Sequence, residues 1–409
     1  MSCFVHVFGV ICEYNPFHNG HRLHLEQTRR QATHVAAVMS GNFVQRGEPA
    51  LLDKWTRARM ALQNGVDLVL ELPLPWAMAG AERFAAGGVA TISALGCAEA
   101  LSFGCEHGSA AALQSAARAL LSPALGEALR PLLDAGLSFA AAREEAVRQR
   151  FGDECAALLQ SPNDILAVEY AKAILRSHSQ LSLFPVRRLG AAHDGEHLSP
   201  ENRLPTGEAV ASASALRQAL QKNENITEFI PQSCRVPLLL AAGERRISGG
   251  MEPLTRAVLA RLRTMTASEA SSLPDVSEGL HNRLLSAARC ADSLPALYAA
   301  AKTKRYSHAR IRRAAAAALL GLREEDCSGT PPYLRVLGLN RRGQEILRQM
   351  KQTAALPVIL RPSEISKLDK RAQRVFSLEC AATDLWALST GKILPAGLDF
   401  STPLVTEGL

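Results

Sequence analysis

The sequence predicts an α/β protein built on a doubly wound parallel sheet. Three observations support this fold class. Short, nearly continuous apolar runs recur over residues 4–190, as expected for strands buried on both faces of a parallel sheet. Segments with helical periodicity separate these runs, as crossover connections require. Polar residues, glycine or proline follow each run, and the ligands of such sheets lie beyond the carboxyl ends of the strands.

Five strands are expected in this first part, at residues 4–12, 34–41, 66–73, 99–106 and 181–189. The first strand ends before Asn15-Pro16, because a residue that precedes proline is pushed away from helical geometry. Pro185 interrupts the fifth strand, which favours a place at the edge of the sheet.

Helices are expected between the strands, opening near residue 18 and then covering 53–64 and 81–95. Another helix begins after Ser161, a good N-cap, with Pro162 in its first turn. Residues 107–160 are rich in alanine, leucine and arginine, and we expect them to form a helical insertion.

From Pro231 onward the chain is mostly helical and basic, although residues 333–350 suggest a strand, a turn and a helix. A short strand at 357–360 and two amphipathic helices follow. A chain of 409 residues is expected to hold two or three domains. We therefore predict an α/β domain over 1–229 and a mainly helical, basic domain over 230–409.

The composition, with 47% apolar and 21% charged residues, is typical of a soluble globular protein. We recognise no secretory leader and no membrane-spanning stretch, so we expect a cytoplasmic protein without membrane association. The nine cysteines are scattered and form no C-x-x-C pair, which argues against a zinc ribbon and a disulfide framework. We expect no structural metal site, and nothing indicates an obligate protein partner.

The basic excess belongs to the second half of the chain. Residues 1–229 hold 20 Lys and Arg against 23 Asp and Glu, whereas residues 230–409 hold 26 against 16. A basic domain beside a ligand-binding domain suggests a polyanionic partner, with RNA as the natural candidate. The alternative is a solvated basic surface without a partner.

The most basic segment, KTKRYSHARIRR, precedes an apolar helical run. Its charges suit a phosphate backbone, and its tyrosine could stack on a base. Alternatively, the segment is the solvated start of a helix whose alanine-rich half packs in a core. The candidate RNA-binding residues are Lys302, Lys304, Arg305, Tyr306, Arg310, Arg312 and Arg313.

Residues 9–24, GVICEYNPFHNGHRLH, place two histidines at the start of the helix after the first strand. His18 and His21 are three residues apart and therefore neighbours on one helical face. Gly20 lets a ligand approach the backbone, and the free N–H groups of a first helical turn attract anions. This arrangement can hold a triphosphate. Taken alone, H-x-G-H also arises by chance, and either histidine could be an ordinary surface or core residue.

Further candidates stand at the ends of the later strands. Residues 40–42 follow the second strand, residues 71–73 close the third and residues 104–106 end the fourth. The fifth strand delivers Arg188, which could neutralise a phosphate or be an ordinary surface charge. The ends of parallel strands meet at one edge of the sheet, so we expect these groups to converge.

A second possible anion site begins the helix expected at 210–220. Ser212 or Ser214 stands at its start, and Arg217 lies one turn further on. The alternative is a plain N-cap followed by a helical arginine.

The H-x-G-H after a first strand resembles the signature of the HIGH-type nucleotidyltransferases. Blocks along nearly the whole chain resemble one family of that superfamily, the tRNA(Met) cytidine acetate ligases. In order, the blocks are GVICEYNPFHNGH, VMSGNFVQRGEPALLDKWTRARMAL, GVDLVLELP, LSFGCE, SPNDILAVEY, VRRLGAAHD, ASASALR, KRYSHARIRR and RVLGLNRRGQEIL.

The resemblance implies an ATP site in which His18 and His21, together with Mg²⁺, are catalytic and steady the α- and β-phosphates. Ser212 and Arg217 resemble an element that closes over phosphates in this superfamily. The implied ATP-binding residues are Ile11, Cys12, Glu13, Tyr14, Asn15, Pro16, Phe17, His18, Asn19, Gly20, His21, Arg22, Leu23, His24, Gly104, Asn163, Arg188, Ser212 and Arg217.

The implied reaction uses ATP to ligate acetate to the wobble cytidine of elongator methionine tRNA, by way of acetyl-adenylate. The domain over 230–409 would bind the tRNA. Two departures from the family pattern affect the pocket: Asp164 stands where a second asparagine is usual, and GAAHD after Arg188 lacks one residue and a tyrosine.

Two other functions stay open at this stage. One is an adenylyltransferase acting on a small-molecule carboxylate or a cofactor precursor, although such an enzyme would not need the large basic domain. The other is a catalytically inactive RNA-binding protein, against which the intact H-x-G-H of residues 18–21 counts.

Overall fold

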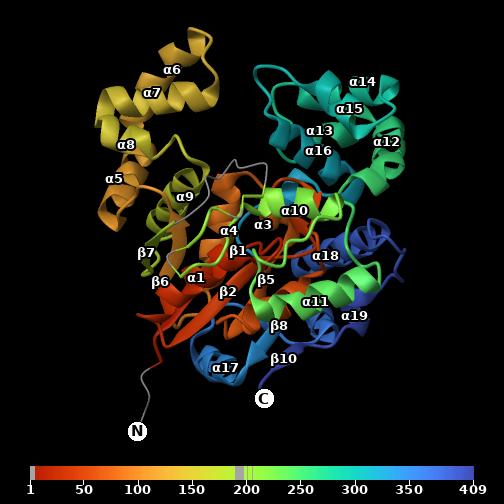
Figure 1. Ribbon diagram of the computed structural model, residues 1–409. Helices are drawn as coiled ribbons and strands as arrows, with labels where there is room; N and C mark the ends of the chain where they lie inside the picture. The colour runs from red at the N-terminus through yellow and green to blue at the C-terminus, as the bar shows by residue number, and fades with distance from the viewer. Residues whose placement is uncertain (1–4, 189–197, 200, 205) are drawn as a thin grey trace.

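Figure 1 shows a computed structural model of the chain, in which residues 5–188, 198–199, 201–204 and 206–409 are described. The strands of the main sheet are β1 (Val7–Cys12), β2 (His34–Ser40), β5 (Leu68–Leu72), β6 (Ala98–Cys105), β7 (Ser182–Arg187), β8 (Leu334–Asn340), β9 (Val358–Ile359) and β10 (Val405–Glu407). Within the described residues this sheet is eight-stranded, in the order β10-β8-β5-β2-β1-β6-β7 with β9 beside β8. Its neighbouring strands are parallel except for β5 and β8. The predicted α/β class is confirmed.

All five strands predicted in the first part are present as β1, β2, β5, β6 and β7. The edge position expected from Pro185 is confirmed, since β7 ends the sheet. The short antiparallel hairpin of β3 (Phe43–Val44) and β4 (Glu48–Pro49) was not predicted. Strands of two residues are too short to show an alternating pattern.

Helices cover both faces of the sheet. On β2, Ala36 and Val38 share a core with α4 and α9, whereas Val35 and Ala37 share a second core with α1 and α2. This alternation is the period of two expected of a strand buried on both faces. The helices of these layers are α1 (Asn19–Arg29), α2 (Lys54–Leu62), α3 (Leu74–Ala77), α4 (Ala81–Ser93), α9 (Pro162–Arg176), α10 (Ala213–Gln221) and α11 (Gln232–Gly243).

Two groups of helices stand at the top of the view in Figure 1, one at the upper left and one at the upper right. The predicted helical insertion is confirmed as α5 (Ala110–Leu121), α6 (Pro123–Asp134), α7 (Phe139–Phe151) and α8 (Asp153–Ala157). Residues 251–327 form the second group, which we call the helical lobe: η1 (Glu252–Leu254), α12 (Thr255–Thr264), α13 (Ala267–Ser271), α14 (Leu280–Cys290), α15 (Leu294–Ala301), α16 (His308–Leu320) and η2 (Glu324–Cys327). None of the described helices is long and apolar enough to cross a membrane.

The expected division of the chain into 1–229 and 230–409 needs correction. Strands β8, β9 and β10 belong to the main sheet, so residues 328–409 share the sheet of the first half and the helical lobe is inserted between them. The apolar strand β8 gains a paired neighbour in β5, and an added Cβ at Gly343 would collide with Asp67 of the segment before β5. The elements after β8 are α17 (Arg341–Thr353), η3 (Pro362–Lys367), α18 (Lys370–Leu388) and α19 (Leu398–Ser401).

A buried cluster of charges ties the two ends of the chain together. Lys54 Nζ of α2 lies 2.8 Å from Glu71 Oε1 of β5 and 2.7 Å from Asp399 Oδ1 of α19. Arg335 Nη1 of β8 lies 3.0 Å from Glu71 Oε2, 2.7 Å from Asp399 Oδ1 and 3.4 Å from Glu379 Oε2 of α18. Burial and the neighbouring Glu71 carboxylate raise the pKa of Glu379 above its ordinary value. Three carboxyl groups thus share two cations away from water.

Replacing Lys54 tests this cluster. Lys54→Met should lower the free energy of unfolding by about 3–5 kcal/mol, because Glu71 and Asp399 would stay buried without that cation. The matched control is Arg59→Met on the same helix, which removes a half-exposed pair with Glu407 and should cost about 0–1 kcal/mol. Denaturant unfolding measures both variants. Equal losses would contradict the importance assigned to the cluster.

Candidate active site

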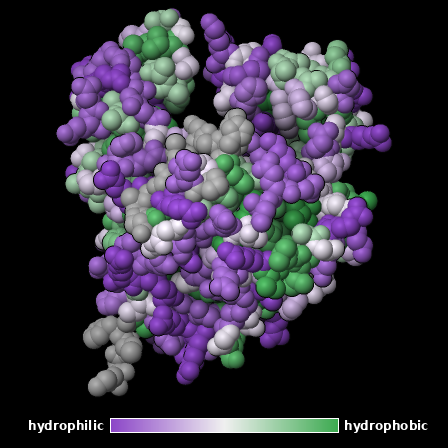
Figure 2. Space-filling view, in the orientation of Figure 1, coloured by the Kyte–Doolittle hydropathy of each residue, from purple (hydrophilic) through white to green (hydrophobic). Residues whose placement is uncertain are grey.

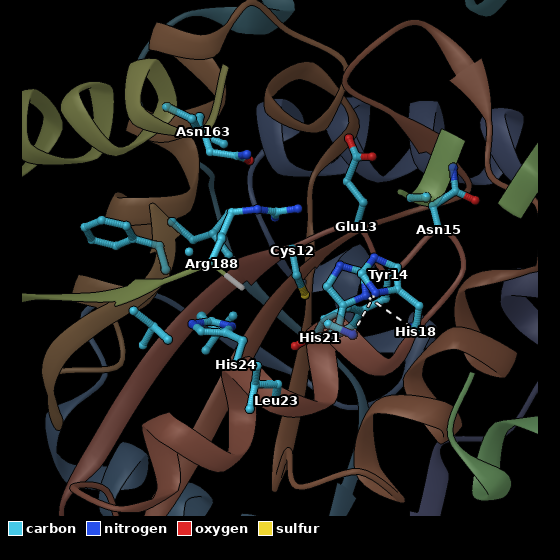
Figure 3. Close-up of a pocket in the computed structure, with 18 of the residues that line it drawn as sticks. Cys12, Glu13, Tyr14, Asn15, His18, His21, Leu23, His24, Asn163 and Arg188 are labelled. Atoms are coloured by element: carbon cyan, nitrogen blue, oxygen red, sulfur yellow. Dashed lines mark hydrogen bonds between the residues drawn. The ribbon is translucent and has the colours of Figure 1, made fainter. Parts of the chain in front are cut away.

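A cavity of about 280 Å³ opens at the carboxyl ends of β1 and β6, with α1, α9 and β7 around it (Figure 3). Most of the residues predicted to bind ATP lie on its wall. These are Ile11, Cys12, Glu13, Tyr14, Asn15, His18, Gly20, His21, Leu23, His24, Gly104, Asn163, Arg188 and Ser212. The convergence expected from their positions along the chain is therefore real for β1, β6 and β7.

The remaining predicted residues lie behind this wall and support it. Phe17 is buried, with its ring 4.8 Å from that of Tyr14. Asn19 Nδ2 donates to the carbonyl oxygens of Ala209 (2.9 Å) and Glu228 (2.8 Å). These bonds fasten the first turn of α1 to the chain on either side of α10.

Arg22 and Arg217 are also engaged with protein groups. Arg22 pairs with Glu208. Arg217 Nη1 donates to the carbonyl oxygen of Asn15 (2.7 Å), and its Nη2 donates to Ser214 Oγ (3.1 Å). Pro16, which follows Asn15, is likewise absent from the wall of the cavity. Arg217 therefore braces the turn between β1 and α1 in this structure.

The two histidines cap α1 and hold each other in place. His18 is the N-cap residue, and its Nδ1 accepts a hydrogen bond from Gly20 N (3.1 Å). His18 N in turn donates to His21 Nδ1 (3.3 Å). Because each Nδ1 is an acceptor, the proton of each neutral imidazole belongs on Nε2. Both rings therefore carry one N–H donor on the side away from the backbone.

Both imidazoles are kept neutral. Their rings stack with centroids 3.7 Å apart, and Figure 3 shows them side by side with the Arg188 side chain extending toward them. Burial, followed by the positive charges of Arg188 and Arg217, lowers the pKa of His18 to about 3. Burial also lowers the pKa of His21 well below its ordinary value, and the charge of a protonated His18 would lower it further. The pair is suited to donate hydrogen bonds to an anion.

Arg188 lies on the opposite wall, at the end of β7. Its backbone N–H donates to the Cys105 carbonyl (2.9 Å), which continues the pairing of β6 with β7. Gly104 leaves room for its side chain, since a Cβ there would lie 3.2 Å from Arg188 Cγ. Among the described residues, no acceptor within hydrogen-bond distance meets the Arg188 guanidinium. A cation without a partner facing two neutral donors favours an anionic ligand. The GAAHD loop at 190–194 lies outside the described residues.

Asn163 and Asp164 begin α9 and organise the loop after β6. Asn163 Nδ2 donates to Glu106 Oε1 (2.7 Å) from the wall of the cavity. The buried Asp164 accepts from Glu106 N (2.7 Å), and its Oδ2 lies 2.9 Å from His107 Nδ1. Asp164, which stands where the family pattern usually has asparagine, thus braces this loop and does not line the cavity. Ligand atoms of Glu106, His107 and Asp164 lie within 4.8 Å of one another, but these hydrogen bonds account for their closeness.

Two of the expected strand ends are sealed by protein. The carbonyl oxygens of Ser40 and Gly41 accept hydrogen bonds from the buried Arg57 of α2, and Asn42 Oδ1 accepts from Lys54 N (2.7 Å). Glu71 belongs to the buried charge cluster. The expectation that the carboxyl ends of β2 and β5 contribute to the site is therefore wrong, because α2 covers them.

Several residues of the wall were not predicted. Gln45 of the β3–β4 hairpin lines the cavity, and its backbone N donates to Glu13 Oε1 (2.9 Å). The others are mostly apolar, and apolar residues in buried elements carry no sequence signal that separates a pocket from a core. They are Val10, Phe84, Phe103, Leu166, Tyr170, Val186, Arg187 and Ala213.

The predicted RNA-binding segment is only partly available to a ligand. Tyr306 is 6% exposed, and its hydroxyl donates to the Glu278 carbonyl inside the helical lobe. The expected stacking of this ring on a base needs correction, because the ring packs in the core of the lobe. Lys302 Nζ donates to the carbonyl oxygens of Thr303 (3.0 Å) and Tyr306 (2.8 Å).

The arginines of α16 have protein partners. Arg310 Nε donates to the Asp275 carbonyl (2.7 Å), and Arg313 pairs with the Asp275 carboxylate (2.9 Å). Arg312 pairs with Glu48 of the β3–β4 hairpin (2.9 Å). Lys304 and Arg305 are exposed beside a surface hollow, and their side chains have no hydrogen-bond or ion-pair partner among the described residues. Within the described part of the chain, these two are the candidate RNA-binding cations of the segment whose side chains no other protein group engages.

The order of elements, with H-x-G-H opening the helix after the first parallel strand, defines a nucleotidyltransferase of the HIGH type. Residues 5–396 match the family described as HIGH nucleotidyl transferase.

Relatives of similar length show which family of nucleotidyltransferases the chain belongs to. The chain is 36% identical over 410 residues to the tRNA(Met) cytidine acetate ligase of Thermoanaerobacter sp. (strain X514), covering 98% of this chain and 99% of the relative. It is 35% identical to that of Clostridium tetani, covering 96% and 97%. The chain belongs to the tRNA(Met) cytidine acetate ligase family.

Two solved structures of Thermotoga maritima TmcAL superpose on this fold. The apo form has a TM-score of 0.92 at 30% identity, covering 99% of this chain and 100% of that one. The form bound with alpha-thio ATP has a TM-score of 0.90 at 31% identity, covering 98% and 99%. The insertion and the helical lobe are thus included in the match.

A pH titration of stability tests the burial of the histidines. His24 lines the cavity beside Ser102 (Nε2 to Oγ, 2.9 Å), and burial, then the charge of Arg188, lowers its pKa to about 4. Between pH 7 and pH 5 the unfolded chain binds a proton at His24 and the folded chain does not. Lowering the pH from 7 to 5 should therefore reduce the free energy of unfolding by about 2 kcal/mol through this group. His24→Gln should lose less stability than wild type over that interval in denaturant titrations. Equal losses would contradict a His24 imidazole that stays neutral in the folded chain.

Proposed function

We propose that this protein is an ATP-dependent ligase that joins acetate to the exocyclic amine of the wobble cytidine of elongator tRNA(Met), giving N⁴-acetylcytidine. The observation that carries the proposal is the pair of neutral Nε2–H donors of His18 and His21, faced across one cavity by Arg188. The names of the relatives and the ATP analogue bound in the Thermotoga maritima structure support the same conclusion.

The chemistry explains why ATP is needed. Acetate is a poor acyl donor, because its leaving group would be oxide. Attack of an acetate oxygen on the α-phosphorus forms a P–O bond and breaks the bond to pyrophosphate, which gives acetyl-adenylate. The cytidine amine then attacks the acetyl carbon, a C–N bond forms, the bond to AMP breaks and the amine loses a proton. Neither step requires a covalent protein nucleophile.

The residues around the cavity can supply what the first step needs. His18 and His21 would donate to the oxygens of the α- and β-phosphates, where negative charge builds up in the transition state. The free N–H groups of the first turn of α1 would add donors at the same place. Arg188 would hold pyrophosphate or the adenylate, and Asn163 would help to fix the nucleotide. Gly104 makes room for Arg188.

Mg²⁺ would enter with ATP and neutralise phosphate charge. The donor set suits a cation that keeps most of its water and phosphate ligands. Among the described residues, Glu13 is the carboxylate on the wall of the cavity, and of its two oxygens Oε1 accepts from Gln45 N. Glu13 Oε2 would be the protein oxygen that approaches the hydrated ion.

The helical lobe would bind the tRNA, with Lys304 and Arg305 as its free cations. We place the reaction in the cytoplasm, where tRNA and ATP are both present. The decisive experiment incubates the protein with ATP, labelled acetate and total tRNA. We expect label in methionine tRNA. Label that reaches small molecules and never RNA would favour an adenylyltransferase, and an absence of ATP binding in calorimetry would favour an inactive RNA-binding protein.

Replacing His21 tests the role of the imidazole pair. His21→Ala should lower acetate-dependent exchange of pyrophosphate into ATP by at least about 100-fold, because one phosphate donor is lost together with the hydrogen bond that His21 Nδ1 accepts from the His18 backbone N. The affinity for tRNA, measured by filter binding, should stay nearly unchanged. The control is His178→Ala, at an exposed histidine beyond the end of α9. Normal exchange in His21→Ala would refute the assignment.

Replacing Lys304 and Arg305 together tests the RNA surface. The double alanine variant should bind tRNA more weakly, and the slope of log affinity against log salt should flatten by about two, one for each lost phosphate contact. The control replaces Arg341 and Arg342, a pair of exposed arginines at the start of α17. Wild-type affinity and slope in the first variant would show that this surface does not meet the RNA.

A further inference from the structure

The turn of the β3–β4 hairpin carries an arginine whose side chain has no protein partner. Arg46 is exposed, and among the described residues its guanidinium has no hydrogen-bond, ion-pair or cation–π partner. An exposed arginine is ordinary by itself, because long charged side chains belong at the surface. The surroundings of Arg46 are not ordinary, because the chain on both sides of it is held in place.

The hairpin is fastened to the cavity on one side and to the helical lobe on the other. Before Arg46, the backbone N–H of Gln45 donates to Glu13 Oε1 (2.9 Å) at the wall of the cavity. After it, Gly47 has φ +76°, and an added Cβ there would lie 2.8 Å from backbone atoms of α16. The Gly47 N–H donates to the Val44 carbonyl (2.9 Å), which closes the turn. The backbone of Arg46 is therefore fixed where the cavity and the lobe meet.

Positive charge gathers at this junction. Arg217 donates to a carbonyl and a hydroxyl oxygen, and no carboxylate pairs with it among the described residues. Burial lowers the pKa of Arg217, and the nearby carboxylates of Glu13 and Glu48 counteract this. The charge of Arg46 also lowers the pKa of Arg217, so the two guanidinium groups are within electrostatic reach of each other. Two arginines held near each other without a paired carboxylate favour an anionic ligand.

This anion is distinct from the ATP phosphates assigned above. The donors of His18 and His21 stand at the first turn of α1, whereas Arg46 does not line the cavity. Figure 3 shows the side chain of Glu13, which the hairpin contacts, extending away from the two imidazoles. In Figure 2 the molecule is hollowed between the insertion and the helical lobe, and hydrophilic side chains of the lobe border the hollow. An anion at Arg46 would therefore lie outside the nucleotide cavity, beside the lobe.

We propose that Arg46 holds a phosphate of the target nucleotide at the mouth of the cavity, and so positions the cytidine amine for acetyl transfer. The proposal rests on the proposed function and concerns its second step, because the first step involves no RNA. Enzymes that react with a base take it out of the stack, and contacts to phosphates keep the nucleotide in register. A guanidinium suits this task, since its planar fork binds two phosphate oxygens at once.

Measuring the two steps separately tests the proposal. Arg46→Ala should leave acetate-dependent exchange of pyrophosphate into ATP within about twofold of wild type. Its single-turnover rate of acetyl transfer from preformed acetyl-adenylate to methionine tRNA should fall by at least about tenfold, because the amine is no longer held in place. Arg46→Lys keeps the charge without the fork and should recover part of this rate. The matched control is Arg30→Ala, at the exposed C-cap of α1, which should change neither rate.

Binding of tRNA gives a readout that does not depend on the reaction. In Arg46→Ala the slope of log affinity against log salt should flatten by about one, and in Arg30→Ala it should not change. Transfer by Arg46→Ala at the wild-type rate, exchange that falls as far as transfer, or an unchanged salt slope would overturn the proposal. A wild type that transfers no acetyl to RNA would refute the proposed function, and the salt slope would still decide whether Arg46 contacts a phosphate.

Discussion

The hydrogen bonds by which two histidines cap α1 are the constraint on which the site depends. His18 Nδ1 accepts a hydrogen bond from Gly20 N, and His21 Nδ1 accepts a hydrogen bond from His18 N. Each ring is therefore fixed in position, in tautomer and in charge at once. A neutral Nε2–H beside a helix N-terminus can only donate, so the ligand must bring acceptors. The same bonds that start the helix thus determine which chemistry the cavity can accept.

The β3–β4 hairpin physically connects this cavity with the helical lobe. At one end, Gln45 lines the cavity and donates to Glu13. At the other end, Gly47 lies against the backbone of Arg313, and Glu48 pairs with Arg312 of α16. A shift of the lobe would therefore act on the wall of the cavity through a few covalently linked residues.

Much of this could be anticipated from local patterns. The apolar runs gave the strands, and Ser161 caps its helix as its side chain predicts. The helix start at His18 followed from the strand and turn before it. The sequence was a poor guide to long-range partners. Arg310 and Arg313 were expected to bind RNA. In the structure Arg310 donates to the carbonyl of Asp275 and Arg313 pairs with its carboxylate, although Asp275 is distant from both in the chain. Tyr306 looked like a stacking platform and is a core residue, since exposure depends on which helices pack around it.

The sequence by itself determined the α/β class, the imidazole pair at the first helix and the residues that approach it from the ends of β1, β6 and β7. These depend on neighbours within a few positions, where side-chain type fixes backbone geometry. Only the tertiary structure decided that β8 pairs with β5, that α2 seals the ends of β2 and β5, and that Lys54 and Arg335 gather three distant carboxyl groups. Such partners are chosen by the packing of the whole chain, and a buried charge shows no local sign of which opposite charge will reach it.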